Sequence, residues 1–294
     1  MNQRIGIIIP TKNREKDILE AIKSSIKQEY KPSEIIIIDQ SDNDKLRFSL
    51  DKFALHNPDI DFKYLYRPDI NGLTAAKNVA IELTKSDILT FIDDDIVLDK
   101  HFIRIIYDIY NRLPEIDGVG GVAIIPSHKG SFLRRKVAII FQLGPFRDIR
   151  ALIQAGYFRN KEIVPTWLLS GGLSSLRRKV FESVLFNDEL KGASPIEDMD
   201  FYLRSKGKFN FVMAVNAKAL HNVSSVNRVS LRNLYKVKLK GFLYIYREYI
   251  KKSPLNILAF VWKIFGLILD AFIISVTTNS LEAVKGLSDA FKKY

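Results

Sequence analysis

The stretch Ile88-Leu89-Thr90-Phe91-Ile92-Asp93-Asp94-Asp95 joins an apolar run to three consecutive carboxylates. Its first five residues are mostly apolar, which is typical of a strand buried on both faces of a parallel sheet, and three carboxylates follow at once. Similar apolar runs occur at 5–9, before Pro10, and at 34–38, before Asp39. The sequence therefore predicts three buried strands that each end at a polar residue or a proline.

Helical patterns separate these strands. Apolar residues recur at helical spacing over 15–29 and 44–56, and another helix is expected over about 72–85, after a strand at 61–66. Strands that alternate with helices form βαβ units, with right-handed crossovers and helices on both faces of a parallel sheet. Ligands of such sheets bind outside the carboxyl ends of the strands. The residues expected at those ends are Pro10-Thr11, Asp39 and Asp93-Asp94-Asp95.

The chain beyond residue 117 has a weaker pattern. The expected elements are strands at 119–126, 163–170 and 209–215 and helices at 177–185 and 197–205. Ser170-Gly171-Gly172 predicts a turn after the second of these strands. The segment 127–162 is basic and has no assignable pattern, so the first half of the chain carries most of the information on fold.

Composition excludes several classes of protein. The chain has 294 residues, no cysteine, 47% hydrophobic residues and 27% charged residues. These values exclude a disulfide framework, a thiolate nucleophile, a cysteine zinc site and an intrinsically disordered chain. The net charge of +12 divides into −4 for residues 1–126 and +16 for the remainder. A basic C-terminal half predicts an anionic partner: nucleic acid, a nucleotide phosphate or the cytoplasmic face of a membrane.

The acidic triplet is the first feature that predicts chemistry. Adjacent carboxylates repel each other unless a cation or several donors neutralise them. In an extended segment Asp93 and Asp95 would project to the same side and share Mg²⁺ or Mn²⁺ through oxygen ligands. The alternative is a solvated acidic turn that caps a helix beginning near Lys100.

Six motifs follow one another along the chain: Ile8-Ile9-Pro10-Thr11-Lys12-Asn13-Arg14, Glu34-Ile35-Ile36-Ile37-Ile38-Asp39, Asn71-Gly72-Leu73-Thr74-Ala75-Ala76-Lys77-Asn78, Asp93-Asp94-Asp95, Gly171-Gly172 and Glu197-Asp198. Their order and spacing resemble family 2 glycosyltransferases with the GT-A fold. The resemblance covers Arg4 to Asn222 and implies an α/β catalytic domain over 1–225, with a nucleotide-binding half (1–126) whose parallel sheet has helices on both faces and an acceptor half (127–225) with mixed strands. A basic, apolar helical region, 226–294, follows.

The resemblance implies roles for the residues of the first half. Asp39 would accept hydrogen bonds from the base, usually uracil in this family, and Asp94 would lie near the ribose. Asp93 and Asp95 would hold the diphosphate of a sugar nucleotide through Mg²⁺ or Mn²⁺. Lys77 could face the nucleotide from the start of its helix, although simple helix capping explains that segment equally well. The segment expected to line the nucleotide pocket contains Pro10, Thr11 and Asn13.

The Glu197-Asp198 pair matches the acceptor-side motif of the family. Asp198 is the candidate general base, because an inverting transfer needs a carboxylate that takes the proton of the acceptor hydroxyl. The alternative is that both are helix N-terminal acids favoured by the helix dipole.

Other candidates on this side have structural alternatives. His221 would complete the metal shell or be a structural histidine. Trp167, before Gly171 and Gly172, would stack on an acceptor sugar or belong to the core.

Two departures from the family pattern concern the nucleotide: Gln40 stands where many relatives have a second aspartate, and Lys77 where arginine is common. No Gln-x-x-Arg-Trp motif follows Asp198, so we expect transfer of a single sugar rather than processive synthesis.

The C-terminal region accounts for much of the excess positive charge. Residues 232–263 contain eight basic residues against one acid, and 255–276 are largely apolar. A helix of 22 residues is about 33 Å long, enough to cross a bilayer. However, Asn256, Lys263 and Asp270 recur every seven residues, and a charge at mid-depth costs roughly 2.5–3.5 kcal/mol. Peripheral membrane association through 232–276 is expected, and partner packing, a true span and a hairpin over the catalytic domain remain open.

Together these observations predict an enzyme that transfers one sugar from a nucleotide-sugar donor, UDP- or dTDP-linked, to a glycan or lipid-linked acceptor in surface polysaccharide synthesis. The apolar run at 5–9 is too short for a secretory signal core, so we expect a cytoplasmic protein at the inner face of the membrane. The alternatives are a metal-dependent nucleotidyltransferase and a basic nucleic-acid-binding module; nucleic acid is not the expected partner.

Overall fold

The computed structural model describes residues 3–126, 131–190, 196–224, 226 and 229–292. Contacts divide the chain into two compact units. Unit 1 contains Met1–Pro126, Phe158–Ala193 and Phe201–Arg228, and unit 2 contains Ser127–Tyr157, Ser194–Asp200 and Val229–Tyr294. The division that the sequence suggested at residue 225 falls on a residue outside the described ranges.

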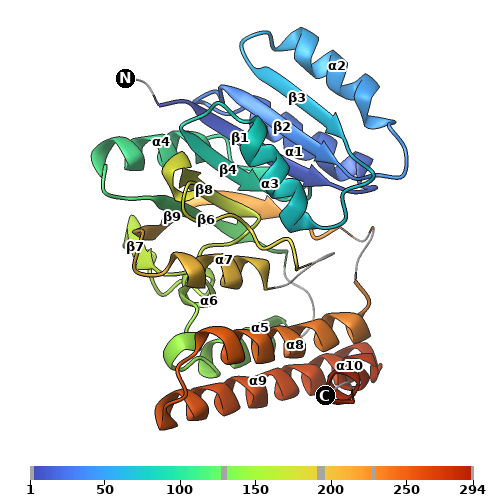
Figure 1. The fold of residues 1–294 in the computed structure, drawn as a ribbon, viewed down its shortest axis with the longest axis vertical. Coiled ribbons are helices and arrows are strands. Elements are labelled where there is room, and N and C mark those ends of the chain that lie inside the picture. Colours follow the sequence, from blue (N-terminus) through green and yellow to red (C-terminus); the bar gives the residue numbers. More distant parts are fainter. Residues whose placement is uncertain (1–2, 127–130, 191–195, 225, 227–228, 293–294) are drawn as a thin grey trace. The chain divides into compact units, whose positions relative to one another are not determined.

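Unit 1 contains a nine-stranded sheet in the order β3-β2-β1-β4-β8-β6-β9-β5, with β7 paired to β9 (Figure 1). The strands are β1 Ile5–Thr11, β2 Glu34–Asp39, β3 Asp61–Tyr66, β4 Ile88–Ile92, β5 Ile96–Leu98, β6 Gly118–Ile124, β7 Ile163–Thr166, β8 Leu173–Arg177 and β9 Phe211–His221. The helices outside unit 2 are α1 Glu15–Ile26, α2 Leu46–His56, α3 Leu73–Leu83, α4 Phe102–Arg112 and the short η2 Arg178–Val180; α7 Glu197–Ser205 has residues in both units.

The first four strands are parallel, as the alternating pattern predicted. Strands β1, β2 and β4 bury both faces: Ile7 and Ile9 belong to a core cluster with Ile18 and Ile22 of α1, whereas Phe91 packs on Phe181 and Phe186 on the opposite side. Two-sided burial explains why these three strands are apolar runs, whereas β3, with a sequence of mixed polarity, is only partly buried. The mixed α/β architecture with helices on both faces is confirmed.

Register brings the polar strand ends together. Thr11 pairs with Asp39 across the parallel β1 and β2. Strand β8 runs antiparallel to β4 with Ile92 opposite Leu173, so Asp93 follows directly beside Gly172, and its N–H donates to the Gly172 carbonyl at 3.0 Å. The sheet therefore builds one polar edge from segments far apart in the chain.

The expected helix at 177–185 is wrong. Strand β8 extends to Arg177, and only the 3₁₀ turn η2 follows. Arg177 is extended because it continues the β8 ladder, and its guanidinium donates to the carbonyls of Tyr110 and Ile116. The helical spacing of the apolar residues after Arg178 reflects core packing of a turn rather than a helix.

Unit 2 is helical (Figure 1). Its elements are α5 Ser131–Ile140, η1 Gly144–Phe146, α6 Ile149–Gln154, α8 Leu231–Tyr249, α9 Pro254–Thr278 and α10 Glu282–Phe291. Helices α8, α9 and α10 share a small core that contains Tyr235, Leu239, Leu267, Ala271, Ala283, Leu287 and Ala290. Gly286 permits close packing of α10 on α8, because a Cβ there would lie 2.1 Å from the Arg232 carbonyl oxygen.

Candidate functional site

The three aspartates after β4 form a tight turn rather than an extended segment. The Ile96 N–H donates to the Asp93 carbonyl at 3.1 Å, and β5 begins at Ile96. The segment is therefore not extended as expected, and the shared side to which Asp93 and Asp95 would project stays a prediction. Arg14 Nη1 lies 2.8 Å from Asp94 and 3.7 Å from Asp95, and we call residues 93–95 the carboxylate turn.

Asp93 lies against the backbone of Gly172. A Cβ at Gly172 would be 2.0 Å from Asp93 Oδ2, so only glycine leaves room for the carboxylate. Burial raises the pKa of Asp93; the positive charge of Lys77 opposes this shift and the negative charge of Asp95 adds to it. The net effect of burial and these charges is a raised pKa for Asp93.

Asp94 is buried between the first strand and the helix that follows it. Its Oδ2 accepts from Thr11 Oγ1 at 2.7 Å, and its Oδ1 accepts from Arg14 Nη1 at 2.8 Å. Burial raises the pKa of Asp94 to about 6, despite these two donors. Asp94 therefore connects the carboxylate turn to the β1 end that was expected to line a nucleotide pocket.

Asp95 connects the turn to the end of β9. His221 Nε2 lies 3.2 Å from Asp95 Oδ1, and the Ser224 N–H donates to Asp95 Oδ2 at 2.9 Å. Burial alone would raise the pKa of Asp95, but the hydrogen bonds from His221 and Ser224 outweigh it and lower the pKa. The hydrogen bond to Asp95 in turn raises the pKa of His221.

Asp39, at the end of β2, is buried and held by two donors. The Ser41 N–H donates to its Oδ1 at 2.9 Å, and the Tyr64 hydroxyl donates to its Oδ2 at 2.9 Å. Asn13 adopts a left-handed conformation with φ 56°, and its N–H donates to Ser41 Oγ at 2.7 Å. The β1 and β2 ends, including Pro10, thus form one fixed edge, whereas recognition of a base by Asp39 stays a prediction.

Lys77 of α3 is buried, and its ammonium donates to the Gly171 carbonyl at 2.9 Å. It also lies 4.9 Å from the ring centroid of Phe186. Lys77 supports the Gly171-Gly172 turn against which Asp93 lies. A direct contact of Lys77 with a nucleotide stays a prediction.

Asp198 lies in the first turn of α7 and pairs with a residue that the sequence did not indicate. Arg150 of α6 donates from Nη1 to Asp198 Oδ2 at 2.6 Å and from Nη2 to Asp148 Oδ2 at 2.8 Å. Burial lowers the pKa of Arg150, but the charges of Asp198 and Asp148 outweigh it, so the pKa is raised and the guanidinium stays charged. Glu197 is buried beside Asp198 at the start of the helix.

Asp200 has a structural explanation. Its Oδ1 accepts hydroxyl donors from Tyr244 at 3.1 Å and Tyr249 at 2.7 Å within unit 2. Among the first-turn acids of α7, Asp198 and Glu197 therefore remain as candidates for chemistry.

Trp167 is half-buried after β7, with Lys206 Nζ 5.6 Å from its ring centroid. Its role in stacking an acceptor sugar is untested. Arg14 and Arg150 are the functional candidates that residue patterns missed. Arg14 lay inside a quoted motif, whereas Arg150 lay in the segment without an assignable pattern.

The oxygen ligands of the carboxylate turn suit a divalent cation, although the described residues contain no preassembled metal centre. Among the described residues, no group of three or more His, Asp or Glu side chains is placed to hold a metal. Asp93 and Asp95 nevertheless offer the hard oxygen ligands that Mg²⁺ and Mn²⁺ prefer, and such ions are commonly held by one or two carboxylates with substrate phosphates. The residues that would hold the ion are Asp93, Asp95 and His221.

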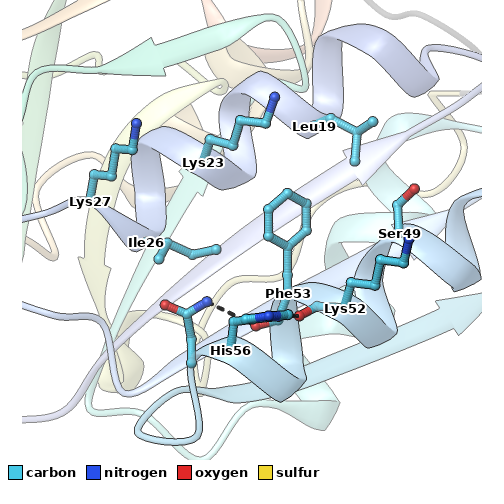
Figure 2. Close-up of a pocket in the computed structure, with 9 residues that line it drawn as sticks. Leu19, Lys23, Ile26, Lys27, Ser49, Lys52, Phe53 and His56 are labelled. Carbon is cyan, nitrogen blue, oxygen red and sulfur yellow. Dashed lines mark hydrogen bonds between the residues drawn. The ribbon is translucent and has the colours of Figure 1, made fainter.

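A separate hollow of about 440 Å³ lies between α1 and α2 (Figure 2). Leu19, Ile26 and Phe53 supply its apolar side chains, and Lys23 and Lys27 are among its lysines (Figure 2). None of the site residues predicted from sequence lines it.

Comparison with known proteins agrees with this arrangement. The family model described as "Glycosyl transferase family 2" matches residues 6–185. The chain is 35% identical over 94 residues to the putative colanic acid biosynthesis glycosyl transferase WcaA of Escherichia coli, covering 32% of this chain and 33% of that protein. It is 30% identical over 91 residues to UDP-Glc:alpha-D-GlcNAc-diphosphoundecaprenol beta-1,3-glucosyltransferase WfgD of Escherichia coli, covering 31% of this chain and 34% of that protein. The chain thus spans about a third of the length of these curated relatives.

The fold resembles that of a solved mannosyltransferase, PcManGT from Pyrobaculum calidifontis, in complex with GDP-Man and Mn²⁺. The TM-score is 0.63 at 14% identity, covering 99% of this chain and 76% of that one. At this identity the likeness establishes the fold alone.

Proposed function

Because the chain belongs to glycosyl transferase family 2, we propose that it transfers one sugar from a nucleotide-sugar donor to a hydroxyl of a glycan or lipid-linked acceptor, with inversion. The observation that carries the proposal is the carboxylate turn at the carboxyl end of β4, where Asp94 and Asp95 are buried and Asp93 fits against Gly172 within the matched region. Open α/β sheets bind ligands at this end of their strands.

The donor side of the reaction is assigned to unit 1. Asp93, Asp95 and His221 would hold a divalent cation that binds the diphosphate, and His221 Nε2 also lies 3.2 Å from Asp95 Oδ1. When bound, Mg²⁺ or Mn²⁺ supplies positive charge that stabilises the leaving diphosphate. The residues that line the nucleotide are Pro10, Thr11, Asn13 and Asp39, and the nucleotide in this proposal is UDP or dTDP. Arg14 fixes Asp94 and so keeps the turn in place.

Asp198 is the proposed general base. The acceptor oxygen forms its bond to the anomeric carbon as the bond from that carbon to the phosphate oxygen breaks; the hydroxyl proton passes to Asp198, and the nucleoside diphosphate leaves. Arg150 positions the Asp198 carboxylate through the hydrogen bond at Oδ2. Glu197, Trp167, Gly171 and Gly172 belong to the acceptor side.

The acceptor is proposed to be lipid-linked because WfgD acts on a diphosphoundecaprenol-linked sugar. The enzyme would then act at the inner face of the cytoplasmic membrane in polysaccharide synthesis. A basic C-terminal region suits such a location, because anionic lipid attracts Lys and Arg.

The function is tested with a panel of UDP-, dTDP- and GDP-sugars, Mn²⁺ and prenyl-diphosphate-linked sugars as acceptors. We expect one donor to give nucleoside diphosphate and a glycosylated acceptor of inverted anomeric configuration. Release of pyrophosphate from the donor would instead indicate a nucleotidyltransferase.

Asp198→Asn tests the base. We expect turnover to fall by about 10²–10⁴-fold while donor binding stays within a few-fold of wild type, since only proton transfer is lost. Asp148→Asn is the matched control, because it removes the other carboxylate paired with Arg150 and leaves Asp198 in place. Near-normal turnover in Asp198→Asn, or an equal loss in both variants, would contradict the assignment.

A further inference from the structure

Helix α9 of unit 2 is both apolar and exposed. It has 25 residues, and among the described residues it is the one helix long and apolar enough to cross a membrane. Only 22% of its most apolar stretch is buried, which distinguishes it from the core helix of a soluble protein. Its exposed apolar side needs an explanation, because large contiguous apolar patches mark interaction sites.

The polar stripe of α9 points toward the other helices of unit 2. Asp270 accepts from Arg134 Nε of α5 at 2.6 Å and from the Tyr235 hydroxyl of α8 at 2.5 Å. Lys263 Nζ lies 5.2 Å from the ring centroid of Phe242, also in α8. The charged residues of the helix are thus used inside unit 2, and they do not interrupt its exposed face.

The exposed face of α9 continues onto α5. Trp262 Nε1 donates to the Ile140 carbonyl at 3.0 Å, and Trp262 and Phe265 both pack on Phe141. Gly266 allows this contact, because a Cβ there would lie 2.3 Å from Phe141 Cβ. We call the resulting patch the α5/α9 apolar surface. It includes Phe132 and Ile140 of α5 and Leu258, Val261, Phe265 and Phe272 of α9, each 52–68% exposed.

The charge around this surface is positive. Lys136 is exposed on α5 with its Nζ 4.6 Å from the Phe132 ring centroid, and Lys251 and Lys252 are exposed just before α9 begins. Asp270 is the only acidic residue in the sequences of α5 and α9, and Arg134 already pairs with it. A second copy of the chain would bring the same cations to the interface without acids to pair them. An anionic lipid surface complements both the apolar face and the cations.

The contacts of α9 also favour one orientation. The Arg134–Asp270 pair and the close contact at Gly266 fix α9 along α5, whose neighbouring Arg135 and Lys136 are exposed. A membrane-crossing α9 would break these contacts or draw the cations into hydrocarbon. Lying in the interface costs neither.

We propose that the α5/α9 apolar surface inserts into the interfacial region of a membrane containing anionic lipid, with α9 parallel to the bilayer plane. This inference goes beyond catalysis, and it is tested without a donor or an acceptor.

The test is flotation of the full chain with vesicles of phosphatidylcholine alone or with 30% phosphatidylglycerol. We expect binding to the anionic vesicles that weakens as salt is raised. Val261→Ser combined with Phe265→Ser should weaken it by at least about ten-fold, because two inserted apolar side chains are lost. The matched control is Phe48→Ser with Leu55→Ser, which removes two exposed apolar side chains from α2 in unit 1 and should bind as wild type.

Depth and self-association complete the test. The fluorescence of Trp262 is the part of the tryptophan emission that disappears in Trp262→Phe. Lipids brominated near the headgroup should quench it more than lipids brominated near the chain ends. Three results would overturn the proposal: no binding to either vesicle, equal binding by Val261→Ser/Phe265→Ser, or stronger quenching at the bilayer centre. If the chain did not bind vesicles, and light scattering showed a dimer that Val261→Ser/Phe265→Ser abolished, the surface would instead be the interface with a second copy.

Discussion

Replacing Gly172 with alanine would place a methyl carbon on the Asp93 carboxylate. The new Cβ would lie 2.0 Å from Asp93 Oδ2 and 2.1 Å from Asp93 Cγ. Since ordinary contacts of this kind exceed 3 Å, the carboxylate must move by about 1 Å or more. A displacement of that size at a reacting centre costs on the order of 10²-fold in rate.

The assay combines nucleoside diphosphate release with thermal unfolding. We expect Gly172→Ala to lose about 10²-fold in turnover and in affinity for UDP with Mn²⁺, and roughly 1–3 kcal/mol in stability from overpacking. Gly120→Ala is the matched control: its Cβ would meet Met213 Sδ at 2.7 Å and Leu169 Cδ2 at 2.9 Å, in the same sheet but away from Asp93. It should lose similar stability and keep its turnover. Wild-type turnover in Gly172→Ala, or the same loss of turnover in both variants, would show that the position of the Asp93 carboxylate does not control the reaction.

Two further predictions concern stability. Glu34 is fully buried; burial alone would raise its pKa, but hydrogen bonds from Lys63, Ser86 and Thr84 outweigh it and lower the pKa from 4.5 to about 2. Glu34 should therefore contribute on the order of 3 kcal/mol to the free energy of unfolding above pH 4.5, and this contribution should be lost as the pH falls toward 2. In urea titrations at several pH values, Glu34→Gln should flatten the dependence of the free energy of unfolding on pH. An unchanged pH dependence in this variant would contradict the assignment. Asn78→Ala should lower the free energy of unfolding by about 1–3 kcal/mol in the same assay, because the Asn78 side chain exchanges hydrogen bonds of 2.9 and 3.0 Å with the Phe186 backbone. A decrease below about 0.5 kcal/mol would contradict this prediction.

The first half of the fold could be predicted from sequence because a strand that is buried on both faces is a continuous run of apolar residues. The runs at 5–9, 34–38 and 88–92 became β1, β2 and β4, and the residues after them meet at one edge of the sheet. Local periodicity was misleading at 177–185, where the last residue of β8, the 3₁₀ turn η2 and the residues after it have apolar spacing that resembles a helix.

Long-range pairing could not be predicted. Arg14 reaches Asp94 across 80 positions, and Arg150 reaches Asp198 across 48. A local pattern does not encode such contacts. Similarly, the seven-residue recurrence of Lys263 and Asp270 predicted a stripe on α9, but its inward direction depends on Arg134, whose segment had no assignable pattern.

³¹P NMR, recorded with Mn²⁺ and again after addition of EDTA, identifies the phosphate product that the enzyme forms from its active sugar nucleotide. If the carboxylate turn holds a sugar-nucleotide diphosphate through a divalent cation, nucleoside diphosphate should accumulate with Mn²⁺ and stop forming with EDTA. The variant that combines Asp93→Asn with Asp95→Asn should form none under either condition. Pyrophosphate as the product, or equal turnover in EDTA, would contradict this role of the carboxylate turn.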